Sequence, residues 1–305
     1  MLTLRQVRYF VATAELGQVS QAAIQLNISQ SAVTSAIQEL EHMLGKPLFL
    51  RSVHGMTLTE SGGYFLNHAY SILRSVDDAV NLPLTDNRIQ GSLRVAASYT
   101  VMGYFLPFHL QRLSLGFPRI DINLYERERE DIEKGLLEHA LDMALVLTGN
   151  LTHPSITAET LFNSERRLWL PSRHPLCDKP QVSLTDVANE PFIMLTVDEA
   201  EQSAMRYWEE CGRRPRVMLC TSSVEAVRSM VANGLGVAIL SDLVYRPWSL
   251  EGRRIETRSL TDNVHPMSVG LAWRRDIEFT PPMQALRQYF RSAFLTPQLN
   301  TSRAR

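Results

Sequence analysis

Apolar residues recur at helical spacing over the N-terminal part of the chain. The spacing predicts one helix over residues 4–16 and a second over 21–26, with Ser20 at the position of its N-cap. Ser29 is placed to cap a third helix, because its hydroxyl can accept the free N–H groups of a first turn. The apolar stripe of that third helix consists of Val33, Ile37, Leu40 and Leu44. The pattern therefore predicts two helices joined by a tight turn at 27–29, preceded by a further helix.

The opposite face of the third helix carries short hydroxyls and amides rather than charges. Such side chains can hydrogen bond base edges and phosphates without filling the groove, as a DNA recognition helix must. Any amphipathic helix also has a polar face, so this pattern alone leaves both a helix-turn-helix and an ordinary helix pair open. The candidate DNA-contacting residues at this helix are Ser29, Gln30, Ser31, Thr34, Ser35 and Gln38.

A short hairpin is predicted after the third helix. Residues 47–51 read as an apolar strand, 52–55 as a turn and 56–59 as an alternating return strand. Three helices followed by a hairpin form a winged helix-turn-helix, whose wing lies beside the groove and contacts the DNA backbone. Arg51 and His54 are the candidate contacts on this wing.

Charge argues against a strong nucleic-acid binder. The net charge of the chain is −1, whereas strong binders are often basic. The charges that balance within residues 1–60 are Arg5, Arg8, Lys46 and Arg51 against Glu15, Glu39, Glu41 and Glu60. Neutral donors and helix N-termini also hold phosphates, and a dimer would double the few basic contacts, so DNA binding stays the working hypothesis.

A long helix is predicted over residues 60–82, with Thr59 as its cap and Pro83 at its end. Its apolar stripe consists of Phe65, Ala69, Ile72, Leu73, Val76 and Val80. Two alternatives would bury this stripe: a two-stranded coiled-coil contact with a second copy, or packing against the helix's own domain. The polar stretch 84–90 is predicted to be the hinge to the second half.

Strands and helices alternate from residue 91 onward. The first series is strand 93–97, helix 102–115, strand 120–125, helix 131–139 and strand 141–147. The second series is strand 161–171, helix 184–189, strand 192–195, helix 200–211, strand 216–220, helix 223–233, strands 237–240, 254–260 and 267–273, and helix 281–294. Such alternation predicts an α/β fold with mostly parallel sheets in two similar lobes. Residues after 296 are predicted to be a disordered tail.

Ligands of open α/β sheets bind outside the carboxyl ends of the strands. The polar residues at those ends are Ser98, Tyr99, Thr100, Arg127, Thr148, Thr196, Thr221 and Ser222. Free N–H groups and hydroxyls from both lobes favour a small anionic metabolite, such as a carboxylate, in the cleft. Alternatives without a ligand stay open for three of these residues: Ser98 or Thr100 as a helix cap, and Arg127 as a solvated charge.

No pattern of an enzyme or a metal site is present. HExxH, GxSxG, P-loop and GxGxxG motifs are absent, so no catalytic residue, metal ligand or cofactor is assigned. The cysteines are Cys177, Cys211 and Cys220, without a CxxC pair, which fits a reduced cytosol. Cys211 and Cys220 are either small core residues or a redox switch. Without a signal peptide or membrane-length apolar run, we expect a cytoplasmic protein that does not contact membranes.

The N-terminal region resembles the DNA-binding domain of LysR-type transcriptional regulators. The resemblance rests on Leu4 to Phe10, Ser20 to Ala23 with Leu26, Ser29 to Thr34, Ile37, Leu40-Glu41, Leu44-Gly45, Pro47 to Phe49, Arg51 and Leu58 to Gly62. In the second half it rests on the arrangement of elements and on residues 222–227 and 234–240. Ser35 stands where many members carry a basic residue, so the phosphate or guanine contact of that basic residue is not carried over to this chain.

The resemblance implies a domain plan and a function. It implies a winged helix-turn-helix over 1–59, a dimerisation helix and hinge over 60–90, and a periplasmic-binding-protein-like effector domain over 91–305. Lobe I would comprise 91–160 and 267–296 and lobe II 161–266, with crossings near 159–162 and 263–267. The implied protein is a homodimer or homotetramer that binds pseudo-palindromic promoter DNA and responds to a small-molecule effector, which changes either DNA bending or contact with RNA polymerase. The alternatives from the residues alone are a cytosolic solute-binding module or an enzyme on the same scaffold.

Overall fold

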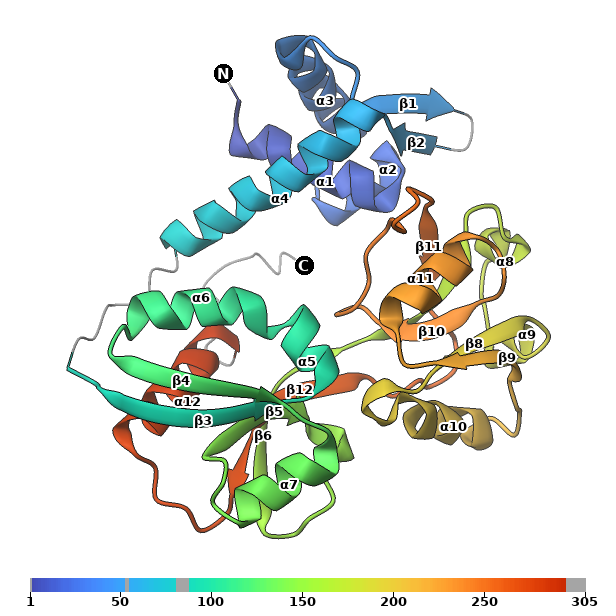
Figure 1. Cartoon of the computed structure of the whole chain (residues 1–305). Helices are drawn as coiled ribbons and strands as arrows, with labels where there is room; N and C mark the ends of the chain where they lie inside the picture. The colour runs from blue at the N-terminus through green and yellow to red at the C-terminus, as the bar shows by residue number, and fades with distance from the viewer. Residues whose placement is uncertain (1, 53–54, 81–87, 295–305) are drawn as a thin grey trace. The chain divides into compact units, whose positions relative to one another are not determined.

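The computed structural model describes residues 2–52, 55–80 and 88–294 (Figure 1). The chain divides into two compact units, Met1–Pro83 and Leu84–Arg305. Each unit buries its own set of apolar side chains, so each has a hydrophobic core of its own.

The N-terminal unit begins with the predicted helices, here α1 (Leu4–Leu16), α2 (Val19–Gln25) and α3 (Gln30–Leu44). Ser20 lies inside α2 and not at its N-cap, which is Gln18. Gly17 ends α1 in the left-handed conformation with φ of 67°, and α2 follows after a single residue. The predicted position of this cap was therefore wrong by two residues.

Burial on α3 follows the predicted stripe except at its last member. Val33, Ile37 and Leu40 are fully buried, whereas Leu44 is 41% exposed. Leu44 borders the turn at Gly45, where a Cβ would meet no atom within 4 Å. The stripe therefore ends one turn before the helix does.

The wing and the next helix are fixed to α3 by backbone contacts. Strand β1 (Phe49–Ser52) pairs antiparallel with β2 (Gly55–Leu58). The carboxylate of Glu41 accepts the N–H of Leu48 at 2.7 Å, which holds the start of the wing against α3. A Cβ at Gly62 would lie 2.1 Å from the Leu48 carbonyl, so glycine is required where the next helix crosses this segment.

Helix α4 (Glu60–Val80) is capped by Thr59, as predicted, since its hydroxyl accepts the N–H of Gly62 at 2.9 Å. The first half of its stripe packs within the unit: Phe65 meets Phe10 edge-on at 4.9 Å, and Ala69 is fully buried. Further along, Ile72, Leu73 and Val76 are only half-buried. The Val80 side chain, Pro83 and most of the predicted hinge lie outside the described residues.

Lobe I of the C-terminal unit is a mixed sheet with helices on both faces (Figure 1). Its strands are β3 (Gly91–Ala97), β4 (Ile120–Glu126), β5 (Met143–Leu147), β6 (Ile156–Ser164) and β12 (Met267–Arg274). Its helices are α5 (Tyr99–Tyr104), α6 (Leu106–Gly116), α7 (Arg129–Leu137) and α12 (Pro281–Phe294), with a short 3-10 turn, Thr148–Asn150, after β5. The strand order is β4-β3-β5-β12-β6, in which β3, β4 and β5 are parallel and β12 runs antiparallel.

Two predicted elements of this half are each divided in the structure. The helix expected over 102–115 is α5 followed by α6, because Pro107 has no N–H to continue the first helix. The strand expected over 161–171 is β6 followed by β7 (Arg166–Pro171), with Glu165 between them. Strand β6 stays in the sheet of lobe I through Ser164, so the first crossing comes later than the expected 159–162.

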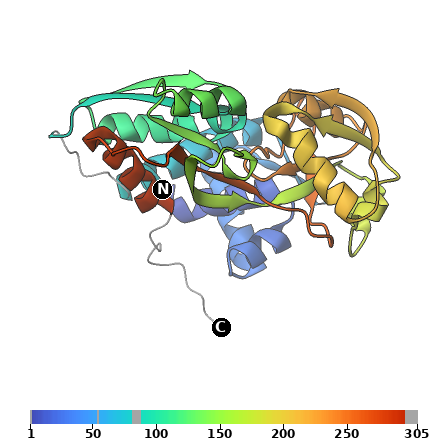
Figure 2. The same cartoon turned by 90° about the horizontal axis from the view of Figure 1, so that it is seen from below.

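Lobe II repeats the layered plan on a smaller scale. Its elements are β7, α8 (Pro175–Asp178), α9 (Leu184–Val187), β8 (Pro191–Leu195), a 3-10 turn (Val197–Glu199), α10 (Ala200–Glu210), β9 (Arg216–Thr221), α11 (Val224–Ala232), β10 (Ala238–Ser241) and β11 (Ile255–Arg258). Strands β10, β7 and β11 form one antiparallel sheet, and β8 pairs parallel with β9. Lobe II lies beside lobe I in both views, yellow to orange beside green (Figure 1, Figure 2).

Candidate functional site

The turn between α2 and α3 brings the polar face of α3 to the surface. Asn27 adopts a left-handed conformation with φ of 54°, which asparagine tolerates well. The N–H of Ile28 donates to the carbonyl of Ala23 at 3.0 Å. The Ser29 hydroxyl accepts the N–H of Ala32 at 3.2 Å, so Ser29 is confirmed as the N-cap of α3. These contacts close a helix-turn-helix.

The candidate DNA-contacting residues lie together on the outer face of this motif. Ser29, Gln30, Ser31, Ser35 and Gln38 are exposed, and Thr34 is half-buried. Arg51 lies in β1 opposite Met56, although its side chain is not among those described. His54 lies outside the described residues. The described part of this surface thus offers hydroxyls and amides, which suit base edges and phosphates.

A cleft of ≈ 670 Å³ lies between the two lobes of the C-terminal unit, at the ends of their strands. The lining residues are Tyr99, Glu126, Arg127, Glu128, Arg129, Asp131, Thr196, Val197, Asp198, Glu199, Gln202 and Ser222. Acidic side chains outnumber basic ones in this lining. The cleft is therefore an electronegative surface around two arginines, Arg127 and Arg129.

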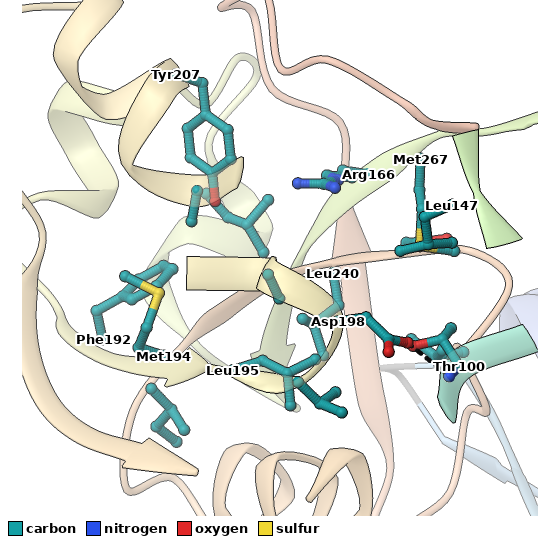
Figure 3. A pocket seen from close by; sticks show the side chains of 17 residues that line it. Thr100, Leu147, Arg166, Phe192, Met194, Leu195, Asp198, Tyr207, Leu240 and Met267 are labelled. Carbon is teal, nitrogen blue, oxygen red and sulfur yellow. Dashed lines mark hydrogen bonds between the residues drawn. The ribbon is translucent and has the colours of Figure 1, made fainter. Parts of the chain in front are cut away.

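The carboxylate of Asp198, from lobe II, binds the first backbone N–H groups of α5, in lobe I. Its Oδ1 accepts the N–H of Tyr99 at 3.2 Å. Its Oδ2 accepts the N–H of Thr100 at 2.6 Å, and Figure 3 shows Asp198 beside Thr100. Free N–H groups at a strand end are where the sequence predicts that an effector carboxylate binds. A side chain of the protein itself holds this position in the structure.

Neighbouring groups add to this contact between the lobes. Arg129 Nε donates to Glu199 Oε1 at 2.9 Å, and Asn150 Nδ2 donates to Glu199 Oε2 at 2.9 Å. Both Asp198 and Glu199 are left-handed, with φ of 52° and 54°. That conformation costs a non-glycine residue about 1–2 kcal/mol, so the contacts must outweigh it. We call the set Asp198, Glu199, Arg129 and Asn150 the inter-lobe clasp.

The structure divides the predicted effector-binding residues into two groups. Tyr99, Arg127, Thr196 and Ser222 line the cleft, and Thr100 lines a second, smaller cavity. Ser98, Thr148 and Thr221 line neither of these two cavities. The hydroxyl of Thr148 lies 2.8 Å from that of Thr160, and the cap of α11 is Ser223, not Thr221 or Ser222.

The smaller cavity, of ≈ 40 Å³, is mostly apolar. Thr100, Leu147 and Met267 line it from lobe I, whereas Phe192 and Leu240 belong to its larger share from lobe II (Figure 3). Because both lobes contribute, the shape of this cavity depends on how the lobes are arranged.

Two polar side chains of lobe II, Arg166 and Tyr207, also line this cavity (Figure 3). Tyr207 is 1% exposed, and its hydroxyl has no hydrogen-bond partner among the described residues. Burial raises the pKa of Tyr207, so it is a neutral donor. Arg166 is half-buried, and in the described part of the chain no carboxylate pairs with it.

Arg166, Tyr207 and Asp198 were not among the predicted site residues, and Arg166 and Asp198 were missed for different reasons. Arg166 precedes the fully buried Leu168 and Leu170 at spacings of two and four residues. Because side chains two apart in a strand point to the same face, Arg166 shares their inward face. That pattern could have identified it. Asp198 and Thr100 are 98 positions apart, and no local pattern links them.

Metal ligands, cysteines and membrane-spanning helices add no further site in the described residues. Among the described residues no group of His, Cys, Asp and Glu side chains could hold a metal ion. Cys177, Cys211 and Cys220 are free thiols. No helix in the described ranges combines the length and apolar character needed to cross a bilayer.

Comparison with known proteins identifies both units. Residues 4–63 match the family described as bacterial regulatory helix-turn-helix protein, lysR family, and residues 86–295 match the LysR substrate binding domain. The chain is 26% identical over 294 residues to the HTH-type transcriptional regulator GltR of Bacillus subtilis, covering 96% of this chain and 97% of GltR.

Solved structures give the same result for the fold. HinK, a LysR family transcriptional regulator from Pseudomonas aeruginosa, matches with a TM-score of 0.62 and 28% identity, over 96% of this chain and 98% of HinK. The predicted fold class is confirmed: a winged helix-turn-helix followed by a two-lobe, periplasmic-binding-protein-like α/β domain. These relatives are regulators and not enzymes. The chain belongs to the LysR family of helix-turn-helix transcriptional regulators.

Proposed function

We propose that this regulator binds a pseudo-palindromic promoter site through α3 and changes its output when a small metabolite binds between its lobes. The observation that carries the proposal is the outer face of α3, which presents uncharged donors directly after a capped turn. The proposed base and phosphate contacts are Ser29, Gln30, Ser31, Thr34, Ser35 and Gln38, with Arg51 and His54 on the wing.

LysR regulators are oligomers, and α4 is the proposed dimer helix of this chain. Its first half packs on α1, whereas Ile72, Leu73 and Val76 remain half-buried within the unit. Burying them against a second α4 would form a homodimer, and pairs of dimers a homotetramer. Two copies of α3 would then enter successive major grooves, about 34 Å apart.

The proposed effector is a small anionic metabolite held between the lobes. Tyr99, Arg127, Thr196 and Ser222 are the proposed contacts in the cleft, and Thr100 lines the smaller cavity. Ser98, Thr148 and Thr221 would contribute only after the lobes rearrange. Such a rearrangement would alter DNA bending or the contact with RNA polymerase, and the regulator would act in the cytoplasm.

A gel-shift assay with DNA from upstream of the protein's own gene tests the first part of this proposal. We expect retarded bands at low salt, competed by the same DNA and poorly by an unrelated duplex of equal length. Footprinting should then show two protected half-sites about one helical turn apart. No specific complex at low salt, from a folded oligomer, would refute the proposal.

A further inference from the structure

The wide cleft is poorly suited to hold a carboxylate at the expected position. Asp198 already binds the N–H groups of Tyr99 and Thr100, and a second carboxylate beside it would meet like charge. Arg129, one of the two arginines of the cleft, is bonded to Glu199 and Glu133. An anion therefore finds few free donors in this lining.

The smaller cavity has the opposite character. Its lining is apolar apart from a few groups, and Arg166 and Tyr207 are donors without a protein acceptor among the described residues. The unpartnered Tyr207 hydroxyl is stronger evidence for a ligand than Arg166, because a buried hydroxyl without a partner is unfavourable and therefore uncommon. Arg206 adds positive charge near Arg166.

The remaining acid of this cavity is Asp198, which lines both the cavity and the cleft. Its oxygens face the start of α5, and Figure 3 shows it beside Thr100, at the opposite end of the labelled group from Tyr207. Tyr207 and the acid thus lie at opposite ends of the labelled group, with Arg166 between Tyr207 and Met267 (Figure 3). A ligand with one anionic end and one apolar part would place its charge away from Asp198.

The volume sets the size of such a ligand. A cavity of ≈ 40 Å³ holds roughly three water molecules, whose share of liquid volume is about 90 Å³. On the same basis a monocarboxylate of two carbons fills about this space, and one of three or four carbons exceeds it somewhat. Dicarboxylates and aromatic acids are larger, and their second polar or bulky part would face apolar side chains such as Phe192 and Leu240.

We propose that the effector of this regulator is a short-chain monocarboxylate, bound in the smaller cavity with its carboxylate on the Arg166 guanidinium and the Tyr207 hydroxyl. This inference rests on the proposed function, an effector bound between the lobes, and specifies both its ligand and its position: the smaller cavity lined by Arg166 and Tyr207 in place of the wide cleft. The apolar end of the ligand contacts residues of both lobes, because Leu147 and Met267 belong to lobe I. Binding thus favours the lobe arrangement in which both sets of residues line the cavity.

Calorimetric titration of the full-length protein with sodium propionate tests the inference, with acetate and butyrate as homologues. Propionamide has nearly the same shape but no charge, and succinate is longer and doubly charged; both should bind at least about tenfold more weakly than propionate. Arg166→Gln should weaken propionate binding by about tenfold or more, and Tyr207→Phe by a similar factor.

Two measurements separate a binding role from a structural one. Tyr207→Phe removes only the unpartnered hydroxyl, so the melting temperature without ligand should stay equal or rise while the ligand-induced increase is lost. Arg167→Gln is the matched control: Arg167 is the next residue, but it is exposed, pairs with Asp242 at 3.0 Å and does not line the cavity. This control should bind propionate normally.

The inference is overturned if propionamide binds as tightly as propionate, if Arg166→Gln leaves the affinity unchanged, or if none of the three acids binds. Gel-shift assays on the same preparation distinguish this failure from failure of the proposed function. Specific DNA binding that responds to another class of small molecule would refute the carboxylate assignment alone. Propionate binding without any specific DNA binding would refute the proposed function and leave the assignment standing.

Discussion

The inter-lobe clasp makes a quantitative prediction at Asp198. Replacing it with asparagine keeps the size of the side chain and its tolerance of the left-handed backbone, but removes the negative charge. Each hydrogen bond to a charged group contributes about 1.5–3 kcal/mol, and the carboxylate accepts two from α5. The amide oxygen of asparagine can still accept one ordinary hydrogen bond of about 1 kcal/mol. The net weakening of the clasp is therefore about 2 kcal/mol or more, near 30-fold in the closing equilibrium.

Amide hydrogen exchange measures the weakening of the clasp at the two N–H groups whose protons Asp198 accepts. The N–H groups of Tyr99 and Thr100 donate to Asp198 only while the lobes are held together. Their exchange in Asp198→Asn should be about 30-fold faster, whereas amides in the centre of β3 should be unaffected. Glu201→Gln is the control, because Glu201 is a nearby exposed acid on α10 that lies outside the clasp. Equal exchange rates in the wild-type protein and Asp198→Asn would show that the carboxylate does not hold the lobes.

Three further predictions concern other parts of the chain. Thr34→Ala with Gln38→Ala should weaken specific DNA binding by about 10- to 100-fold in fluorescence anisotropy without lowering the melting temperature. Gly62→Ala should destabilise the N-terminal unit by more than about 2 kcal/mol in thermal denaturation, since its Cβ would overlap a backbone carbonyl. The pKa of buried His109 is lowered to about 4, mainly by burial, so only the unfolded state gains a proton as the pH falls below 6.5. Stability should therefore fall between pH 6.5 and 4, by about 3 kcal/mol in total.

Matched variants test each of these expectations. Gly63→Ala places a Cβ where no atom lies within 4 Å, so it should be neutral or stabilising by up to about 1 kcal/mol. His109→Phe cannot titrate and should lose that part of the pH slope, measured as the difference from the wild-type protein. Unchanged DNA affinity in the double alanine variant would remove both side chains from the contact surface. Equal stability of the two glycine variants would contradict the close approach at Gly62.

Local patterns were sufficient for most of the fold. The 3.6-residue period and the caps predicted α1, α3, α4 and α12 closely, because a helix's buried face and its first turn are properties of neighbouring residues. The errors also have local causes. Pro107 ends a hydrogen-bond ladder that the apolar spacing alone would continue, and Glu165 separates two apolar strands that form one run in the sequence.

The residues of the candidate site were likewise predictable only where their contacts are local in the chain. Ser29 could be assigned from the sequence, because an N-cap bonds to a residue three positions away. Strand ends correctly indicated the edge where the lobes meet, since all parallel strands of one sheet present their carboxyl ends together. Which groups are free at that edge depends on contacts between lobes, and those contacts join residues far apart in the chain.

The position of Asp198 shows why this distinction matters for function. In the sequence, the start of α5 offers N–H donors to an external anion; in the structure those donors are satisfied by Asp198 of the other lobe. A ligand that displaced this carboxylate would have to replace two charge-assisted hydrogen bonds before gaining any affinity. Arg166 and Tyr207 have no protein acceptor to displace within the described residues, so binding there starts without that cost. We therefore expect an anion to bind in the smaller cavity, although the residues at the strand ends pointed to the wide cleft.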